Sequence, residues 1–189
     1  MRATMEVLVA DPAHHSASNG VSKIQSLAAL LPVRERLRSG GRQVVFTNGH
    51  FELLHPGHVR YLQHARSLGD CLIVGLNDDA GTRRLKGPGR PLLNQDARAE
   101  VLAALACVDY VVSFAGDTAQ ELVRALLPDI YVKGGDYAPD DGGKPLPEAA
   151  IVRGYGGRVV LVPLVSGYST TALIREIVAR FASRPPAAP

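Results

Sequence analysis

Short runs of β-branched and aliphatic residues alternate with amphipathic stretches along most of the chain. This alternation is typical of parallel strands joined by crossover helices. The apolar runs predict strands at about 43–47, 71–76, 110–113, 130–133 and 159–162. We therefore expect an α/β fold, a Rossmann-like doubly wound sheet of about five parallel strands with helices on both faces.

The stretches between these runs carry apolar residues at helical spacing. They predict helices at about 24–38, 57–67, 95–106 and 118–126, and a last helix that begins after Ser169 or Thr170. Thr118 and Glu121 stand at the spacing of a capping box for the fourth helix. Ligands of an open parallel sheet bind beyond the carboxyl ends of its strands, so functional side chains are expected just after the strands.

The two ends of the chain lack this pattern. Residues 1–20 are mostly small and polar, and residues 183–189 are rich in proline. We expect a disordered N-terminus at 1–20, one domain at 21–182 and a loose tail at 183–189. A chain of 189 residues is long enough for one ordinary globular domain.

Charge and cysteine content narrow the class of protein. The net charge is +3, but lysines and arginines are scattered, which favours a small anionic substrate over nucleic acid. Cys71 and Cys107 lie in separate apolar runs, where each thiol is expected to act as a small buried hydrophobe. No apolar run is long enough to span a membrane, and no secretory signal is present, so cytoplasmic location is expected.

The first segment with candidate chemistry leads from the first strand into the first crossover helix. It reads Phe-Thr-Asn-Gly-His-Phe-Glu-Leu-Leu-His-Pro-Gly-His, from Phe46 to His58. Its glycines allow close backbone approach, and a helix N-terminus points free N–H groups at a phosphate. His55 and His58 can both donate to an α-phosphate. The alternatives are a surface helix or a metal site, and the second lacks neighbouring Cys ligands.

A second segment, from Asn77 to Pro91, follows the second strand. Asp78 can contact an acceptor sugar or cap a helix. Lys86 and Arg90 stand in a stretch rich in Gly and Pro that is expected to be a loop. They can reach a phosphate or remain solvated.

Two further segments follow the fourth strand and open the last helix. In Val-Lys-Gly-Gly-Asp-Tyr, Lys133 and Asp136 can supply charge or hydrogen bonds beside a planar base, although a tight turn explains the same residues. Ser169, Thr170 and Thr171 can hold terminal phosphates or serve as ordinary helix caps. Arg175 lies one turn further along.

Together the four segments resemble the cytidylyltransferase-like nucleotidyltransferases, whose signature is Gly-x-Phe-Asp-x-x-His-x-Gly-His. Glu52 replaces the usual Asp, and His50 occupies a variable position. Arg-Leu-Lys-Gly-x-x-Arg-Pro and Lys-Gly-Gly-Asp-Tyr are similar to segments of heptose 1-phosphate adenylyltransferases. The Ser/Thr run resembles a triphosphate-binding motif, and no Arg precedes it as in glycerol phosphate and choline phosphate enzymes.

This resemblance implies transfer of AMP from ATP, with Mg²⁺, to D-glycero-D-manno-heptose 1-phosphate, giving ADP-heptose and pyrophosphate. It further implies a separate heptose kinase upstream, for which this chain has no room, and a homodimer. The implied catalytic residues are His55, His58 and Lys86. The implied nucleotide-binding residues are Thr47, Asn48, Gly49, His50, Phe51, Gly57, Lys133, Gly134, Asp136, Ser169, Thr170 and Thr171. The implied acceptor-binding residues are Glu52, Asn77, Asp78, Arg90 and Arg175.

Two other functions remain open at this point. A cytidylyltransferase acting on a polyol or alcohol phosphate shares the fold and the chemistry. A nucleotide-binding regulator without enzymatic activity belongs to a different class. Tight ATP binding without pyrophosphate release would distinguish the regulator from both enzymes.

Overall fold

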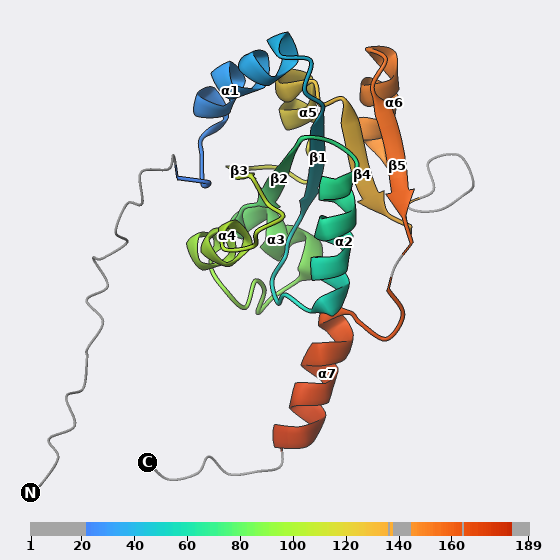
Figure 1. Cartoon of the computed structure of the whole chain (residues 1–189). Coiled ribbons are helices and arrows are strands. Elements are labelled where there is room, and N and C mark those ends of the chain that lie inside the picture. The colour runs from blue at the N-terminus through green and yellow to red at the C-terminus, as the bar shows by residue number, and fades with distance from the viewer. Residues whose placement is uncertain (1–21, 136, 138–144, 164, 183–189) are drawn as a thin grey trace, which may run out of the picture.

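A computed structural model describes residues 22–135, 137, 145–163 and 165–182 of the chain (Figure 1). The strands are β1 Val44–Gly49, β2 Cys71–Asn77, β3 Tyr110–Phe114, β4 Ile130–Gly134 and β5 Arg158–Val162. The helices are α1 Leu27–Ser39, α2 Pro56–Ser67, α3 Asp79–Lys86, α4 Gln95–Ala103, α5 Gln120–Leu126, α6 Pro147–Gly154 and α7 Thr170–Phe181.

The five strands form one parallel sheet in the order β3-β2-β1-β4-β5. The chain starts at the centre with β1, adds β2 and β3 on one side, and then crosses to add β4 and β5 on the other. The change of direction falls between β1 and β4. The predicted Rossmann-like, doubly wound fold is confirmed.

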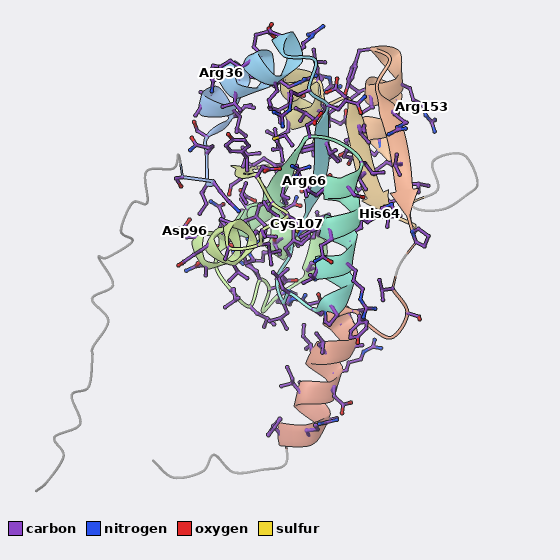
Figure 2. All side chains as sticks on the ribbon, in the orientation of Figure 1. Arg36, His64, Arg66, Asp96, Cys107 and Arg153 are labelled. Atoms are coloured by element: carbon purple, nitrogen blue, oxygen red, sulfur yellow. The ribbon has the colours of Figure 1, made fainter. Side chains whose placement is uncertain are left out.

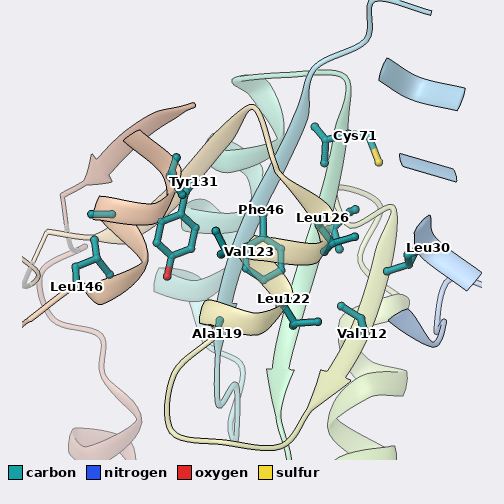
Figure 3. Packing of buried hydrophobic residues seen from close by; sticks show 14 residues of the cluster. Leu30, Phe46, Cys71, Val112, Ala119, Leu122, Val123, Leu126, Tyr131 and Leu146 are labelled. Carbon is teal, nitrogen blue, oxygen red and sulfur yellow. The ribbon is translucent and has the colours of Figure 1, made fainter. Parts of the chain in front are cut away.

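Alternating residues of each strand pack against helices on opposite faces of the sheet. Phe46 and Tyr131, whose rings stack at 5.9 Å, lie in the core that α1, α5 and α6 cover (Figure 3). Val45 and Val132 point to the other face, under α2 and α4. Burial on both faces explains why the strands appear in the sequence as nearly continuous apolar runs.

Several predicted helix boundaries were wrong. Helix α1 begins at Leu27 rather than near Ile24, because Ile24 forms a bridge with Val111 of β3 and Ser26 caps the helix. The capping box predicted for Thr118 and Glu121 does not form. Helix α5 starts at Gln120 after Ala119, which makes no side-chain cap.

Two helices were not predicted: α6, and α3, which occupies part of the stretch expected to be a loop. As a result, Lys86 ends a helix rather than lying on a loop. The predicted helix at 95–106 also stops early, at Ala103. The segments expected to be loose, 1–20 and 183–189, lie outside the described residues.

Helix α7 differs from the others because it projects away from the sheet and buries no residue (Figure 1). Its side chains extend into open space over most of its length (Figure 2). Ile177, Val178 and Phe181 are each more than half exposed. Within the described ranges, no helix is both long and apolar enough to cross a membrane.

The two cysteines are free. Cys71 is buried at the start of β2, and burial raises the pKa of its thiol to about 12. Cys107 is partly buried after α4. Cys71 therefore acts as the small buried hydrophobe that the sequence predicted.

Candidate nucleotide-binding site

A cavity of about 660 Å³ opens at the carboxyl ends of β1 and β4, where the sheet changes direction. Most of the predicted site residues line it. They are Asn48, Gly49, His50, Phe51, Glu52, His55, Gly57, His58, Asn77, Lys86, Arg90, Lys133, Gly134, Ser169, Thr170 and Thr171. Thr47, Asp78 and Arg175 are not part of this lining. Asp136 lies outside the described residues.

The two histidines of the first segment form a stacked pair at the start of α2. His55 is the N-cap residue, and its Nδ1 accepts a hydrogen bond of 3.3 Å from the backbone N–H of His58. The two rings lie 3.8 Å apart, and Phe51 packs against His58 from another side. Since Nδ1 of His55 accepts, the neutral ring carries its proton on Nε2, where it can be donated to a ligand.

Both rings are held in their neutral form. Burial, and then repulsion from His55 whenever that ring is protonated, lower the pKa of His58 to about 4. Burial also lowers the pKa of His55. Nδ1 of His58 is buried without a hydrogen-bond partner among the described residues. At neutral pH these side chains can act as polar donors to a phosphate, but neither carries a positive charge.

The hydroxyl of Tyr61 links α2 to β1 and β4 by hydrogen bonds. Tyr61 of α2 donates to the carbonyl of Val132 at 3.0 Å, and its oxygen lies 2.7 Å from Oγ1 of Thr47. Thr47 is fully buried, so it reaches the cavity only through Tyr61, which lines it. The sequence pattern assigned Tyr61 no role.

The ends of β1 and β4 are joined by a second set of contacts. Lys133 donates from Nζ to the carbonyl of Asn48 at 3.1 Å, and Tyr131 donates to the Asn48 side chain at 2.8 Å. The Lys133 ammonium also lies 4.7 Å from the centre of the Tyr137 ring. These contacts hold the positive charge of Lys133 at the cavity, between the ends of β1 and β4.

Glu52 and Arg90 form a bidentate ion pair. Nε of Arg90 lies 2.6 Å from one carboxylate oxygen of Glu52, and Nη2 contacts the other oxygen. Burial opposes ionisation of Glu52, but the hydrogen bonds and charge of Arg90 hold its pKa below the ordinary value. The longer side chain that replaces Asp thus secures the segment that carries Arg90, with a further bond from the Leu92 amide.

His50 is enclosed by cations. Its Nδ1 lies 3.0 Å from Oγ1 of Thr82, and its carbonyl accepts from the buried guanidinium of Arg98 at 2.6 Å. Burial and the charges of Lys86, Arg98 and Lys133 lower the pKa of His50 to about 4, against the opposing charge of Glu52. His50 is consequently a neutral hydrogen-bonding group beside the cavity.

Helix α3 orients the residues that follow β2. Asp78 is its N-cap and accepts from the Gly81 amide at 2.6 Å, which is the capping alternative raised from the sequence. Asp79 forms an ion pair with Arg98 at 2.6 Å. Lys86, in the last turn, is exposed and lines the cavity, which leaves its charge available to an anion.

The start of α7 closes the remaining side of the cavity. Ser169 is the N-cap, and its hydroxyl accepts from the Ala172 amide at 3.0 Å. Just before it, the Tyr168 ring stacks on His55 at 6.2 Å, and the Arg60 guanidinium lies 6.0 Å from the same ring. Ser169 is therefore an ordinary cap as well as a cavity residue. Arg175 is exposed one turn beyond.

Sequence reasoning missed several lining residues besides Tyr61 and Tyr168. Glu148 is buried on α6, where Oε1 accepts from the Ala119 amide at 2.7 Å. Asp117 and Thr118 also contribute to the wall. The sequence offered a signal for the two tyrosines, because Tyr61 follows His58 by three residues and Tyr168 directly precedes the Ser-Thr-Thr run. It offered none for Glu148, which lies in a helix that the pattern did not predict.

The described residues contain no group of three His, Cys, Asp or Glu side chains that could hold a metal ion. Glu148 accepts a backbone hydrogen bond from Ala119, and Asp136, Asp140 and Asp141 lie outside the described residues.

With this geometry established, comparison with known proteins identifies the family. The family described as "Cytidylyltransferase-like" matches residues 46–176, which include all four segments described above. The chain belongs to the cytidylyltransferase-like family. It is therefore a nucleotidyltransferase, as the resemblance implied.

Curated relatives of this cytidylyltransferase-like chain include two proteins named "Bifunctional protein HldE". The one from Trichlorobacter lovleyi is 52% identical over 177 residues, covering 93% of this chain and 35% of the relative. The one from Syntrophotalea carbinolica is 55% identical over 170 residues, covering 89% of this chain and 34% of the relative. The chain spans about a third of the length of these relatives.

Solved structures agree on the fold of this cytidylyltransferase-like chain. The lipopolysaccharide core biosynthesis protein from Thermoplasma volcanium is 26% identical, with a TM-score of 0.53. The match covers 68% of this chain and 100% of that protein. A pantoate-beta-alanine ligase from Francisella tularensis has the same TM-score at 12% identity and supports the fold alone.

Proposed function

We propose that this nucleotidyltransferase transfers AMP from ATP to D-glycero-D-manno-heptose 1-phosphate, releasing pyrophosphate and forming ADP-heptose. Support comes from the Lys-Gly-Gly-Asp-Tyr and Arg-Leu-Lys-Gly-x-x-Arg-Pro segments and from about 50% identity to HldE proteins. Because the chain spans only about a third of the length of these relatives, the substrate is argued from the site as well.

The observation that carries the proposal is that the N-termini of α2 and α7 meet at one cavity. Helix N-termini bind anions through free N–H groups and their dipole. Two helix N-termini at one cavity suit a ligand that carries several linked phosphates, such as a nucleoside triphosphate. In the proposed complex, His55 and His58 contact the α-phosphate, and Ser169, Thr170 and Thr171 contact the β- and γ-phosphates of MgATP.

The neutral histidines fit a reaction that needs no protein base. The phosphate oxygen of the acceptor is already anionic at neutral pH and attacks the α-phosphorus, while the bond to the bridging oxygen of pyrophosphate breaks. As this happens, negative charge moves onto the pyrophosphate. Donors aimed at that charge lower the barrier, as in other sites that stabilise developing anions. Lys86 supplies the nearby positive charge.

Acceptor binding is proposed for the opposite wall of the cavity. Asn77 and the Glu52–Arg90 pair line this wall, with Lys86 at the end of α3 beside them. Two of the three guanidinium nitrogens of Arg90 already bond the Glu52 carboxylate. Arg90 would therefore position the acceptor rather than neutralise its phosphate. Asn77, whose amide donates to the Gly116 carbonyl at 3.3 Å, is fixed in one orientation and suits a sugar hydroxyl.

Pyrophosphate release with matched substrates tests this function. ATP and CTP would each be supplied with the heptose 1-phosphate, glycerol 3-phosphate or choline phosphate. We expect turnover only with the heptose 1-phosphate, and a preference for ATP. A preference for CTP with an alcohol phosphate would assign the chain to the cytidylyltransferase branch. Tight ATP binding with no pyrophosphate from any acceptor would support the regulator.

The proposed reaction requires a kinase that forms the sugar 1-phosphate. We further propose that this kinase acts before the present enzyme and that the enzyme works as a homodimer in the cytoplasm. Co-expression with a heptose kinase and measurement of ADP-heptose would check the first point. Sedimentation at several protein concentrations would check the second.

A further inference from the structure

A second cavity, of about 410 Å³, lies at the opposite end of the sheet from the nucleotide site. Gln43 before β1, Ile130 at the start of β4 and Arg158 at the start of β5 form its floor. Arg34 and Arg38 of α1, Leu127, Asp129 and the residues Tyr155–Gly157 also line it. The reaction described above uses none of these residues.

The charges around this cavity are unbalanced. Arg34, Arg38 and Arg158 line it together with a single carboxylate, that of Asp129, which leaves a net charge of +2. Both oxygens of Asp129 are already engaged. One accepts from Arg34 at 3.0 Å, and the other accepts from the Val44 amide at 2.7 Å. A cation would meet repulsion here, whereas an anion would meet two arginines without an ion-pair partner among the described residues.

Arg34 is the fixed part of this cluster. Only 7% of the residue is exposed, and its guanidinium donates to the carbonyls of Leu126 and Leu127 as well as to Asp129. Its remaining nitrogen, Nη1, is buried and has no partner in the described part of the chain. An unmatched buried nitrogen of a charged group is uncommon in proteins and calls for a bound water, ion or ligand nearby.

The other wall leaves room for a ligand. Gly156 has φ of 88°, a conformation that favours glycine, and a Cβ there would meet nothing within 4 Å. Arg38 and Arg158 are exposed and can turn toward an anion that enters. Arginine forks match the oxygens of phosphate well, because each can donate two parallel hydrogen bonds.

From these observations we propose that this cavity binds a phosphate dianion, either free or as a small monoester, between Arg38 and Arg158 and above the fixed charge of Arg34. The site is separate from the nucleotide site, since the two cavities lie at opposite ends of β1 and β4 and share no lining residue.

Amide NMR of the whole chain can test the proposal, because each cavity has its own reporters. Inorganic phosphate and methyl phosphate would be titrated at constant ionic strength. We expect saturable shifts of the Gly156, Gly157 and Arg158 amides. Shifts at Gly49, Gly57 and Thr170 would report the nucleotide site separately. Comparison of the two probes distinguishes a site for free phosphate from one that accepts an ester.

Matched variants give the decisive result. Arg38→Gln and Arg158→Gln should each weaken phosphate binding roughly fivefold at the Gly156 reporter, as expected for loss of one exposed charge contact. Arg36→Gln, an exposed change on the same helix that Figure 2 labels and that does not line the cavity, should leave it unchanged. An absence of saturable shifts at Gly156 and Gly157 would overturn the proposal. So would equal affinities of the parent, Arg38→Gln and Arg158→Gln chains.

Discussion

Helices α2 and α7 both begin at the nucleotide cavity, but they are held there in different ways. Helix α2 buries Leu62 and Ala65 against the sheet and carries the Tyr61 bond to two strands. Helix α7 buries no residue, and the ring contacts described for its approach, between Tyr168, His55 and Arg60, lie just before its first turn. A helix N-terminus can thus be held by packing along the helix or by contacts of the residues just before it.

The largest effect is expected at the start of the packed helix. Because His58 is aimed at charge that develops during the reaction, His58→Ala should raise the barrier by roughly 3–4 kcal/mol, or two to three decades in kcat. ATP affinity should change little. Steady-state kinetics of pyrophosphate release would measure both.

The control for His58 lies on the same helix. His64, labelled on α2 in Figure 2, is exposed and outside the cavity, so His64→Ala should keep full activity. Melting temperatures must be measured for both variants, since a buried ring can matter for folding alone. An unchanged melting temperature with kcat within about threefold of the parent would refute the role of His58.

The second test compares apolar side chains of the two helices. Leu62→Ala leaves a cavity in a fully buried part of the core and should lower the free energy of unfolding by about 3 kcal/mol. Ile177→Ala, at a residue 52% exposed on α7, should change it by less than about 0.5 kcal/mol. Urea denaturation of the parent and the two variants measures both changes in the free energy of unfolding. A loss above about 2 kcal/mol for Ile177→Ala would mean that the α7 face is covered in solution.

A smaller effect is expected at the first turn of α7. Thr170→Ala and Thr171→Ala should each weaken ATP binding by about 1 kcal/mol, the usual scale for one hydrogen bond. AMP binding should not change, because AMP lacks the β- and γ-phosphates. Calorimetry with both nucleotides tests the assignment. Equal losses for ATP and AMP would reduce these residues to helix-capping side chains.

A change of a different kind is expected in a pH titration. Burial lowers the pKa of His58 to about 4, so its ring should stay neutral from pH 8 down to about 5. An unfolded chain takes up this proton near pH 6.5. The stability linked to His58 is therefore fully present above pH 6.5 and is lost as pH falls toward 4. Side-chain NMR of His58 would show an ordinary midpoint near 6.5 if the ring were solvated.

The sheet could be predicted from sequence because its information is local. A strand buried on both faces, such as β2, appears as an uninterrupted apolar run whatever its neighbours are. Helix ends depend on distant residues instead. Ile24 leaves the helical pattern to pair with Val111, and the Ala119 amide before α5 donates to Glu148, 29 residues away. Neither contact leaves a periodic trace in the sequence.

The candidate site shows the same division. The glycines, histidines and hydroxyl residues that line the cavity stand in short segments just after strands, where the fold places ligands. Arg98 could not be found in this way. It is a buried cation inside an amphipathic helix, and its partners, Asp79 and the His50 carbonyl, are 19 and 48 residues away. Such a residue is recognised only once the helices are assembled.

Gly57 has a consequence for how freely this sequence can vary. A Cβ at this position would come within 3.0 Å of the His55 ring and 3.2 Å of the Tyr168 Cβ. At Gly154, in contrast, a Cβ would meet nothing within 4 Å. In a library that samples every amino acid at both positions, Gly154 should tolerate many replacements. Position 57 should remain glycine, since any side chain there separates the rings that join the two helices.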